Sequence, residues 1–149
     1  MKTSIDSRSR GSYILLIEIS DRVNVKVGAL GPVTFPQGFY AYCGSAMGGL
    51  GARINRHVRR EKKIHWHVDY LLAEGRIKGM MSAITSVRLE CQLAQKLEKV
   101  FHFYPGFGSS DCGCPSHLFF SEEFPLLQEK TAAVFRALLK GGALIVEEC

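Results

Sequence analysis

The sequence has no long apolar segment. No run approaches the roughly 18 consecutive apolar residues that a membrane-spanning helix needs, and the first ten residues, MKTSIDSRSR, lack the apolar middle of a signal peptide. These absences predict a cytoplasmic protein without a membrane partner. Residues 1–10 are polar, and we expect them to be flexible or disordered.

Cysteine is present, but not in a pattern that favours disulfides. There are five cysteines, an odd number, and the expected cytoplasmic location makes thiols or metal ligands the better interpretation. Cys112, Cys114 and His117 lie close together in the sequence, and Cys91 could join them in a zinc site. Only one residue separates Cys112 from Cys114, which is tighter than in most zinc fingers, so reduced thiols are the preferred alternative.

The composition suits one globular domain. The chain has 149 residues, of which 46% are hydrophobic and 22% charged, as in ordinary soluble proteins. Apolar and alternating patterns predict short strands and amphipathic helices in mixed order, which indicates the α+β class. The expected strands are 11–19, 23–27, 39–44, 77–86 and 118–120, and the expected helices are 50–60, 65–74, 87–100 and 124–140.

Positive charge is concentrated in one segment. Between residues 52 and 63 there are six cations and one anion, which accounts for the whole net charge of +5. Such a cluster is typical of a polyanion site, although a solvated helix face is an equal alternative. With about 100° per residue, Arg53 and His57 lie one turn apart at the edge of the apolar face, whereas Arg59 faces water.

A glycine-rich turn comes directly before this basic helix. Glycine lets backbone N–H groups approach a ligand at a helix N-terminus, where the helix dipole favours anions. We therefore expect Gly48 and Gly49 to contact a phosphate, although an ordinary tight turn would look the same. The turn is not a nucleotide-binding P-loop, because no Gly-Lys-Ser/Thr sequence follows it.

One carboxylate lies where it needs a partner. In the helix expected at 87–100, Leu89, Leu93, Leu97 and Val100 form an apolar stripe, and Glu90 falls at its margin. A carboxylate that loses water there must be paired. The partner is either an arginine or a hard cation such as Mg²⁺.

These motifs resemble the GIY-YIG nuclease superfamily. GSY (11–13) and YCG (42–44) stand on two strands, Arg53 and His57 on the following helix, and Glu90 on a later helix. The segments GFYAYCGSAMGGLGARINRHVRR, HWHVDYLL, ECQLAQ and GFGSSDCGCPSHLF are similar to its small stand-alone prokaryotic branch, the Uri-type endonucleases. The resemblance covers about residues 11–120.

The resemblance implies a small central, mostly antiparallel sheet flanked by helices, with a C-terminal helical extension. A single domain would span 11–149, with its core at about 11–120. The apolar stripe of the helix expected at 124–140 would then be either part of the core or the face of a homodimer.

The resemblance also implies hydrolysis of DNA phosphodiester bonds with one Mg²⁺ or Mn²⁺ per site. Because the sequence has no evident base-specific recognition element, we expect DNA structure or damage, as in DNA repair, to direct the cleavage. Glu90 would hold the metal, and Arg53 would stabilise charge on the scissile phosphate. Tyr13 would take a proton from water, which at neutral pH requires nearby positive charge. His57 would receive or relay that proton, and Tyr42 would position water or phosphate.

Phosphate contacts outside the reacting centre would come from the glycine turn and from the cations of the basic segment. No element reads as a base-specific recognition motif. The residues expected to bind nucleic acid are Gly48, Gly49, Arg56, Arg60, Lys62 and Lys63.

The sequence departs from the superfamily at several positions. Ser12 and Cys43 replace the usual isoleucines, a mild change if both only fill strands. Many members also have an asparagine after the glutamate helix, whereas the only asparagines here are Asn24 and Asn55. That supporting role is missing or passes to a residue in 109–111.

Two other functions are consistent with the same residues. A nucleic-acid-binding module that no longer cuts would keep the basic helix and the glycine turn for phosphate contacts. A zinc-stabilised adaptor would instead have the cysteine and histidine cluster of residues 91–117 as its main feature.

Overall fold

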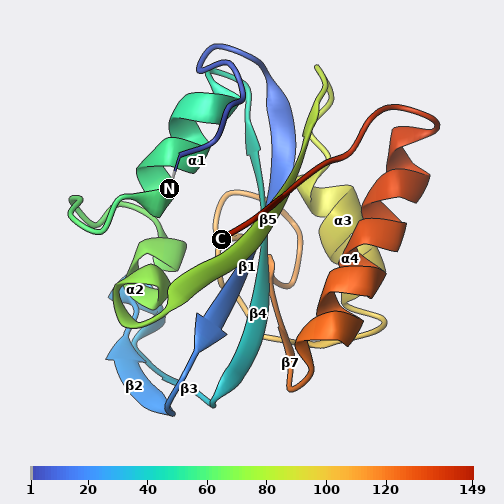
Figure 1. Ribbon diagram of the computed structural model, residues 1–149. Helices are drawn as coiled ribbons and strands as arrows, with labels where there is room; N and C mark the ends of the chain where they lie inside the picture. The colour runs from blue at the N-terminus through green and yellow to red at the C-terminus, as the bar shows by residue number, and fades with distance from the viewer. Residues whose placement is uncertain (1) are drawn as a thin grey trace.

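The computed structural model describes residues 2–149, which form the α+β fold expected from the sequence (Figure 1). The main sheet consists of β1 (Gly11–Ile19), β4 (Gly38–Ala46), β5 (Arg76–Ile84), β6 (His102–Phe103), β7 (Leu118–Ser121) and β8 (Ile145–Glu148). Its order is β6-β7-β4-β1-β5-β8, and each neighbouring pair is antiparallel. A separate hairpin is formed by β2 (Val23–Lys26) and β3 (Pro32–Phe35).

Helices cover both faces of the main sheet. They are α1 (Leu50–Val58), α2 (His67–Glu74), α3 (Glu90–Leu97) and α4 (Phe124–Leu139). Figure 1 shows α1 and α2 on one face together with β2 and β3, and α3 and α4 on the other. None of the helices within residues 2–149 has the length and apolar character that crossing a bilayer would require.

The central strand β1 is buried on both sides, as its nearly continuous apolar sequence predicts. Successive side chains point to opposite faces of a strand. Tyr13 and Leu15 therefore enter the core beneath α1 and α2, while Ile14 and Leu16 enter the core beneath α3 and α4. This alternation decides which side of the sheet each polar residue of β1 and β4 can reach.

Two glycines let the elements at the centre of the fold approach closely. Gly44 pairs with Tyr13 in the β1–β4 register, and a Cβ at Gly44 would lie 2.5 Å from Cζ of Tyr13. A Cβ at Gly11 would lie 2.2 Å from the carbonyl oxygen of Ala83. Packing therefore requires the glycines of both tyrosine motifs, and it sets the Tyr13 ring directly against β4.

Three strands are not evident from the sequence. β3 lies in a segment whose glycines and prolines predicted turns, and Pro32 stands at its first position, where a missing N–H is tolerated. β6 and β8 are too short for an alternating pattern to stand out. Because β8 pairs with β5, the C-terminal part of the chain is not only helical but returns to the sheet.

The third helix is shorter than its sequence pattern suggested. α3 ends at Leu97, whereas the apolar stripe had been extended to Val100. Leu93 and Leu97 are fully buried, but Val100 is 52% exposed. The assignment of Val100 to the core face is wrong, because the helical period stops before that residue.

The fourth helix packs on the main sheet. Leu127 and Phe135 of α4 are fully buried in the core beneath α3 and α4. The core interpretation is therefore confirmed for these two residues of the apolar stripe, whereas Leu126 is 40% exposed. A homodimer stays a prediction.

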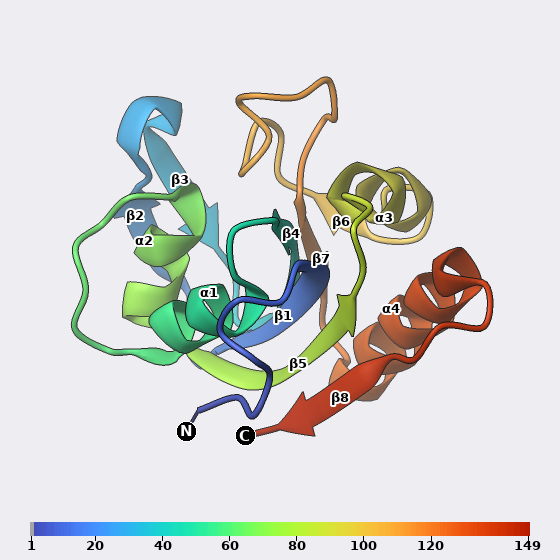
Figure 2. The same ribbon diagram turned by 90° about the horizontal axis from the view of Figure 1, so that it is seen from above.

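The N-terminal segment packs along α1, in contrast to the expected flexibility of residues 1–10; residue 1 lies outside the described residues. The backbone N–H of Thr3 donates to Oδ1 of Asn55 at 2.8 Å, and Oγ1 of Thr3 donates to Oε1 of Glu147 at 2.6 Å. Figure 2 shows the segment passing α1, with the two ends of the chain near each other. A polar segment is held here by hydrogen bonds, which composition does not reveal.

The close approach of Gly44 to Tyr13 gives a test of the packing. Gly44→Ala forces a methyl group into the space of the tyrosine ring, and we expect a loss of about 1–3 kcal/mol in the free energy of unfolding. Gly48→Ala is the matched control, because a Cβ there meets no heavy atom within 4 Å, and we expect a change within about 0.5 kcal/mol. Denaturant unfolding measures both values, and equal losses would contradict the described contact.

Candidate active pocket and metal centre

A polar pocket, called the candidate pocket below, lies where β1, β4, α1 and the first turn of α3 meet. Trp66 and the loop between β6 and β7 complete its walls. Four of the five predicted catalytic residues line it, and the fifth, His57, lies directly behind Tyr13. The lining residues are Tyr13, Tyr42, Cys43, Gly44, Ser45, Arg53, Trp66, Arg88, Glu90, Gly108, Asp111 and His117.

Tyr13 and His57 form a buried pair. They are 1% and 2% exposed, and Oη of Tyr13 lies 2.8 Å from Nε2 of His57. Burial raises the pKa of Tyr13 to about 12, and the charge of Arg53 offsets this only in part. Burial likewise lowers the pKa of His57 to about 3. The expected effect of positive charge on Tyr13 is present, but burial outweighs it, so both side chains are neutral at pH 7.

Tyr42 lies beside this pair on the same face of the sheet. Its ring centroid is 6.5 Å from that of Tyr13 and 6.4 Å from that of His57. Burial raises the pKa of Tyr42 well above its ordinary value. A neutral phenol in this position can donate or accept one hydrogen bond at the pocket wall.

Arg53 brings an unneutralised positive charge to the pocket. Its Nη1 donates to the carbonyl oxygen of Ser45 at 3.3 Å, and its guanidinium lies 4.4 Å from the ring centroid of Trp66. Within residues 2–149 no carboxylate forms an ion pair with Arg53. Trp66 thus orients a guanidinium that keeps donors for an anion entering the pocket.

Glu90 stands opposite, at the first position of α3. Oγ of Ser45 donates to Oε2 of Glu90, and no arginine or lysine in the part of the chain that the structure describes forms a salt bridge with it. Of the two partners that the sequence left open for this carboxylate, the arginine is therefore not found. A hydrogen-bonded carboxylate facing a polar pocket is a suitable ligand for a hard cation.

Ser12 and Ser45 position Glu90, and sequence reasoning missed both. Oγ of Ser12 lies 2.7 Å from Oγ of Ser45 and accepts the backbone N–H of Leu89 at 2.9 Å. The two hydroxyls therefore hold the start of α3 against β1 and β4. Ser12 is not a strand filler, whereas Cys43 is buried in the core beneath α3. The sequence did contain a signal for Ser12, which is a hydroxyl in an otherwise apolar buried strand. A buried hydroxyl needs a hydrogen-bond partner, so this residue could have been expected to contact another polar group.

Arg56 has structural partners. Its Nη1 and Nη2 donate to the two oxygens of Asp69 at 3.0 and 2.9 Å, and Nη2 also donates to the carbonyl oxygen of Lys63 at 2.8 Å. Burial alone would raise the pKa of Asp69, but hydrogen bonds from Arg56 and from the backbone of Trp66 and His65 outweigh it and lower that pKa. This network joins α1 to the start of α2. The role of Arg56 in nucleic-acid binding stays a prediction.

The glycine turn does not leave the N-terminus of α1 open to a ligand. The backbone N–H of Leu50 donates to the carbonyl oxygen of Ser9, and that of Gly51 donates to the carbonyl oxygen of Asp6 at 3.2 Å. A Cβ at Gly49 would lie 2.3 Å from a carbonyl oxygen of the same N-terminal segment. The chain's own backbone therefore occupies two N–H groups at this helix end, and the glycines allow it to come close. The phosphate contact at Gly49 stays a prediction.

The remaining predicted nucleic-acid contacts lie at the surface beyond this turn. Gly48, Arg60 and Lys63 are exposed. Nζ of Lys62 donates to two carbonyl oxygens near the C-terminal end of α1, where a cation is favoured by the helix dipole, and Arg60 donates to a backbone carbonyl at 3.0 Å. These four residues keep their assignment as a prediction.

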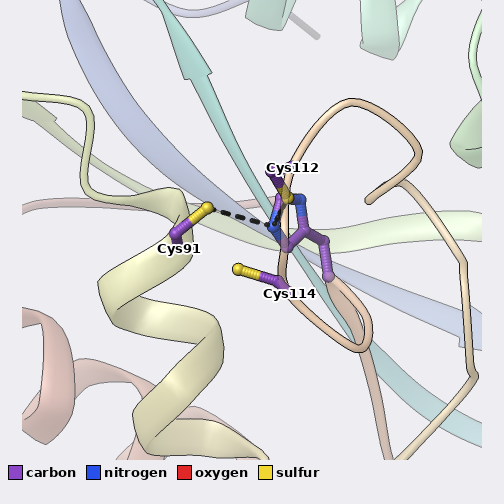
Figure 3. A group of neighbouring side chains, drawn as sticks. Cys91, Cys112 and Cys114 are labelled. Carbon is purple, nitrogen blue, oxygen red and sulfur yellow. Dashed lines mark hydrogen bonds between the residues drawn. The ribbon is translucent and has the colours of Figure 1, made fainter.

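Cys91, Cys112, Cys114 and His117 come together beside the candidate pocket. Their ligand atoms all lie within 4.8 Å of one another, and Figure 3 shows the sulfurs of α3 and of the β6–β7 loop gathered around one imidazole. Nε2 of His117 is 3.8 Å from Sγ of Cys91 and 3.5 Å from Sγ of Cys112. This group could hold one metal ion.

The fold and the pocket define an α+β domain in which two tyrosines, an arginine, a histidine and a glutamate from separate elements converge beside a cysteine and histidine cluster. The chain belongs to the family described as a domain of unknown function, DUF123, whose model matches residues 12–140. That span contains the candidate pocket and all four residues of the cluster. No curated protein and no solved structure matches the chain.

The Arg56–Asp69 pair predicts unequal effects of two neighbouring arginines. Arg56→Ala leaves the fully buried Asp69 carboxylate without its cation, and we expect a loss of about 3 kcal/mol in the free energy of unfolding. Arg59→Ala is the control, because Arg59 is exposed and outside the network, and a change within about 0.5 kcal/mol is expected. Denaturant unfolding of both variants measures the difference. Similar values would mean that Asp69 does not depend on Arg56.

Proposed function

We propose that the protein is a divalent-metal-dependent endonuclease of the GIY-YIG type that hydrolyses DNA phosphodiester bonds. The observation that carries the proposal is the convergence of Arg53 and Glu90 on one pocket, each without a salt-bridge partner among the described residues. A guanidinium that faces a carboxylate across a polar pocket suits a phosphodiester substrate. The negative charge on the phosphate needs stabilisation as the ester bond breaks.

Glu90 is the residue that would hold Mg²⁺ or Mn²⁺. Its carboxylate is fixed by Ser45 and Ser12 and faces the pocket, and hard cations prefer such oxygen ligands. The bound ion would neutralise negative charge on the phosphate. Asp111 lines the same pocket and stands in the segment expected to replace the missing asparagine.

Arg53 would contact the scissile phosphate from the α1 side. Its guanidinium is oriented by Trp66 and by the carbonyl of Ser45, so little side-chain freedom is lost when an anion binds. Donors fixed in advance stabilise developing charge more effectively than mobile ones.

Tyr13 and His57 would activate the attacking water. In the tautomer whose Nε2 accepts, Tyr13 gives its proton to His57 while its oxygen takes a proton from water. The resulting hydroxide forms a new bond to phosphorus and one P–O ester bond breaks. The leaving oxygen takes a proton from solvent, and His57 later releases to solvent the proton that it accepted. Because burial raises the pKa of Tyr13 to about 12 and lowers that of His57 to about 3, the negative charge that develops on the attacking oxygen needs nearby positive charge, which Arg53 and a bound divalent ion would supply.

The charge of the segment that contains Arg53 supports DNA as the substrate. The basic segment 52–63 carries the net charge of the chain, and Arg59, Arg60 and Lys63 on it are exposed. Such cations contact phosphates without reading sequence. A binding module that does not cut is the second candidate, because the same surface supports it without any use of Glu90.

Replacing the proposed metal ligand separates these two functions. We expect Glu90→Gln to lower Mg²⁺- or Mn²⁺-dependent nicking of DNA by about 100-fold or more, since it removes the ligand charge. DNA affinity should change only slightly, because Glu90 contributes no positive charge. Cleavage assays on single-stranded, flapped, branched and damaged DNA, with binding measured in parallel, provide the test.

The control for this variant is Glu129→Gln on α4, which alters an exposed carboxylate outside the pocket and should leave nicking unchanged. A wild-type chain that binds DNA but cuts no substrate with either metal would favour the binding module. Undiminished nicking by Glu90→Gln would remove Glu90 from the mechanism.

The pKa of Tyr13 predicts how the cleavage rate depends on pH. The proposed relay uses both side chains in their neutral forms, and the pKa values of about 12 for Tyr13 and about 3 for His57 lie outside the assay range, so we expect the rate to change less than about threefold between pH 6.5 and 9. Single-turnover rates with Mn²⁺ measure the slope, and Tyr13→Phe should abolish most of the activity. A rate that rises about tenfold per pH unit would instead indicate that Tyr13 reacts as the phenolate and does not pass its proton to His57.

A further inference from the structure

We infer that Cys91, Cys112, Cys114 and His117 bind one Zn²⁺ that has a structural role and fixes the β6–β7 loop as one wall of the candidate pocket. This site is separate from the proposed metal at Glu90 and does not depend on the proposed cleavage reaction. Three observations carry the inference: the geometry of the ligand atoms, the exposure of residues 110, 111 and 113 at the loop tip, and the shared walls of the cluster and the pocket.

The ligand atoms are close to the arrangement that zinc requires. A tetrahedral zinc with Zn–S near 2.3 Å and Zn–N near 2.0–2.1 Å separates its ligand atoms by about 3.5–3.8 Å. The distances from Nε2 of His117 to Sγ of Cys91 and Cys112 are 3.8 and 3.5 Å, and all four atoms fall within 4.8 Å. Three thiolates and one imidazole favour zinc over Mg²⁺ or Mn²⁺. Because four protein ligands leave no open position, the site is structural.

The histidine is already oriented as a metal ligand. Its backbone N–H donates to the carbonyl oxygen of Phe107 at 2.8 Å, and its carbonyl oxygen accepts the N–H of Cys43 at 3.0 Å. These backbone bonds hold the residue so that Nε2 of its ring faces the thiols of Cys91 and Cys112, the orientation that a metal ligand needs.

The loop tip depends on the cluster for its position. The base of the loop is held by the N–H of Gly106, which donates to the carbonyl oxygen of Pro115 at 2.7 Å, and by the buried Phe107. At the tip, residues 110, 111 and 113 are exposed, and the N–H of Cys112 donates to the carbonyl oxygen of Ser109 at 3.3 Å. Long loops without regular structure are uncommon in compact domains unless something fixes them. A metal joining the tip to α3 supplies that link.

The cluster and the candidate pocket share a wall. Cys91 directly follows Glu90 on α3, and His117 lines the pocket together with Gly108 and Asp111. A displacement or disorder of the loop tip would therefore change the wall of the candidate pocket that faces Glu90. Zinc at this cluster sets the distance between the loop and the first turn of α3.

Metal analysis of matched cysteine variants tests the site. We expect the purified chain to contain about one zinc per molecule, and Cys112→Ser and Cys114→Ser each to lose it. Cys149→Ser is the control: Cys149 lies outside the cluster, and its replacement should leave the zinc content unchanged. Replacement of zinc by Co²⁺ should give the visible absorption of a tetrahedral thiolate site. A reduced wild-type chain that binds neither ion, or a disulfide within the cluster, would overturn the inference.

Hydrogen exchange on the wild-type chain tests the role of the metal without relying on variants that might not fold. On chelation we expect amide exchange in residues 109–116 to accelerate at least tenfold, while β1, β4 and β5 stay protected. Fluorescence of Trp66, the only tryptophan, should change as well, because Trp66 and the loop line the same pocket. Re-addition of zinc should reverse both effects. Unchanged exchange in residues 109–116 would show that the metal does not hold the loop.

Discussion

The antiparallel register between β1 and β4 is the constraint on which the site depends. It pairs Tyr13 with Gly44 and Ser12 with Ser45. Because side chains alternate along a strand, a slip of one residue would exchange the two faces of β1. Tyr13 would then lose His57, and Ser12 would no longer reach the start of α3. The contact of the Tyr13 ring with Gly44, which has no side chain, makes that register specific.

The two sides of the main sheet contribute opposite kinds of group to the pocket. α1 brings the guanidinium of Arg53 from one side, and α3 brings the carboxylate of Glu90 from the other. The strands between them carry neutral tyrosines, because burial opposes their ionisation. Without a charged substrate and a cation, the pocket therefore holds its acid–base groups in their uncharged forms. Under the proposed function, such a site would react only after a cation has bound in it.

Much of the fold and part of the site could be predicted from the sequence. The apolar run of residues 11–19 was sufficient to predict the buried strand β1. The helical spacing of Arg53 and His57 was sufficient to place them one turn apart on α1. Both predictions depend on local patterns of burial and periodicity. The shared pocket with Glu90 followed only from the resemblance. The roles of Ser12 and Ser45 could not be read, since their hydroxyls act across strands. The position of the N-terminal segment could not be predicted either, because its contact with Gly51 is a backbone hydrogen bond, which leaves no pattern in the side chains of the sequence.

Glu90 and Cys91 are neighbours in the chain, yet they face ligands of different chemistry. Successive helical residues point about 100° apart, so the carboxylate meets Ser45 and the candidate pocket while the thiol meets the β6–β7 loop. Oxygen ligands select hard cations, whereas thiolates select zinc. Two neighbouring residues in the first turn of α3 would thus bind two different ions: Glu90 the proposed catalytic ion, and Cys91 the proposed structural zinc. The difference between the carboxylate and the thiolate would decide which ion each residue binds. Since both depend on the same helical turn, the serines that hold α3 against the sheet position the two sites together.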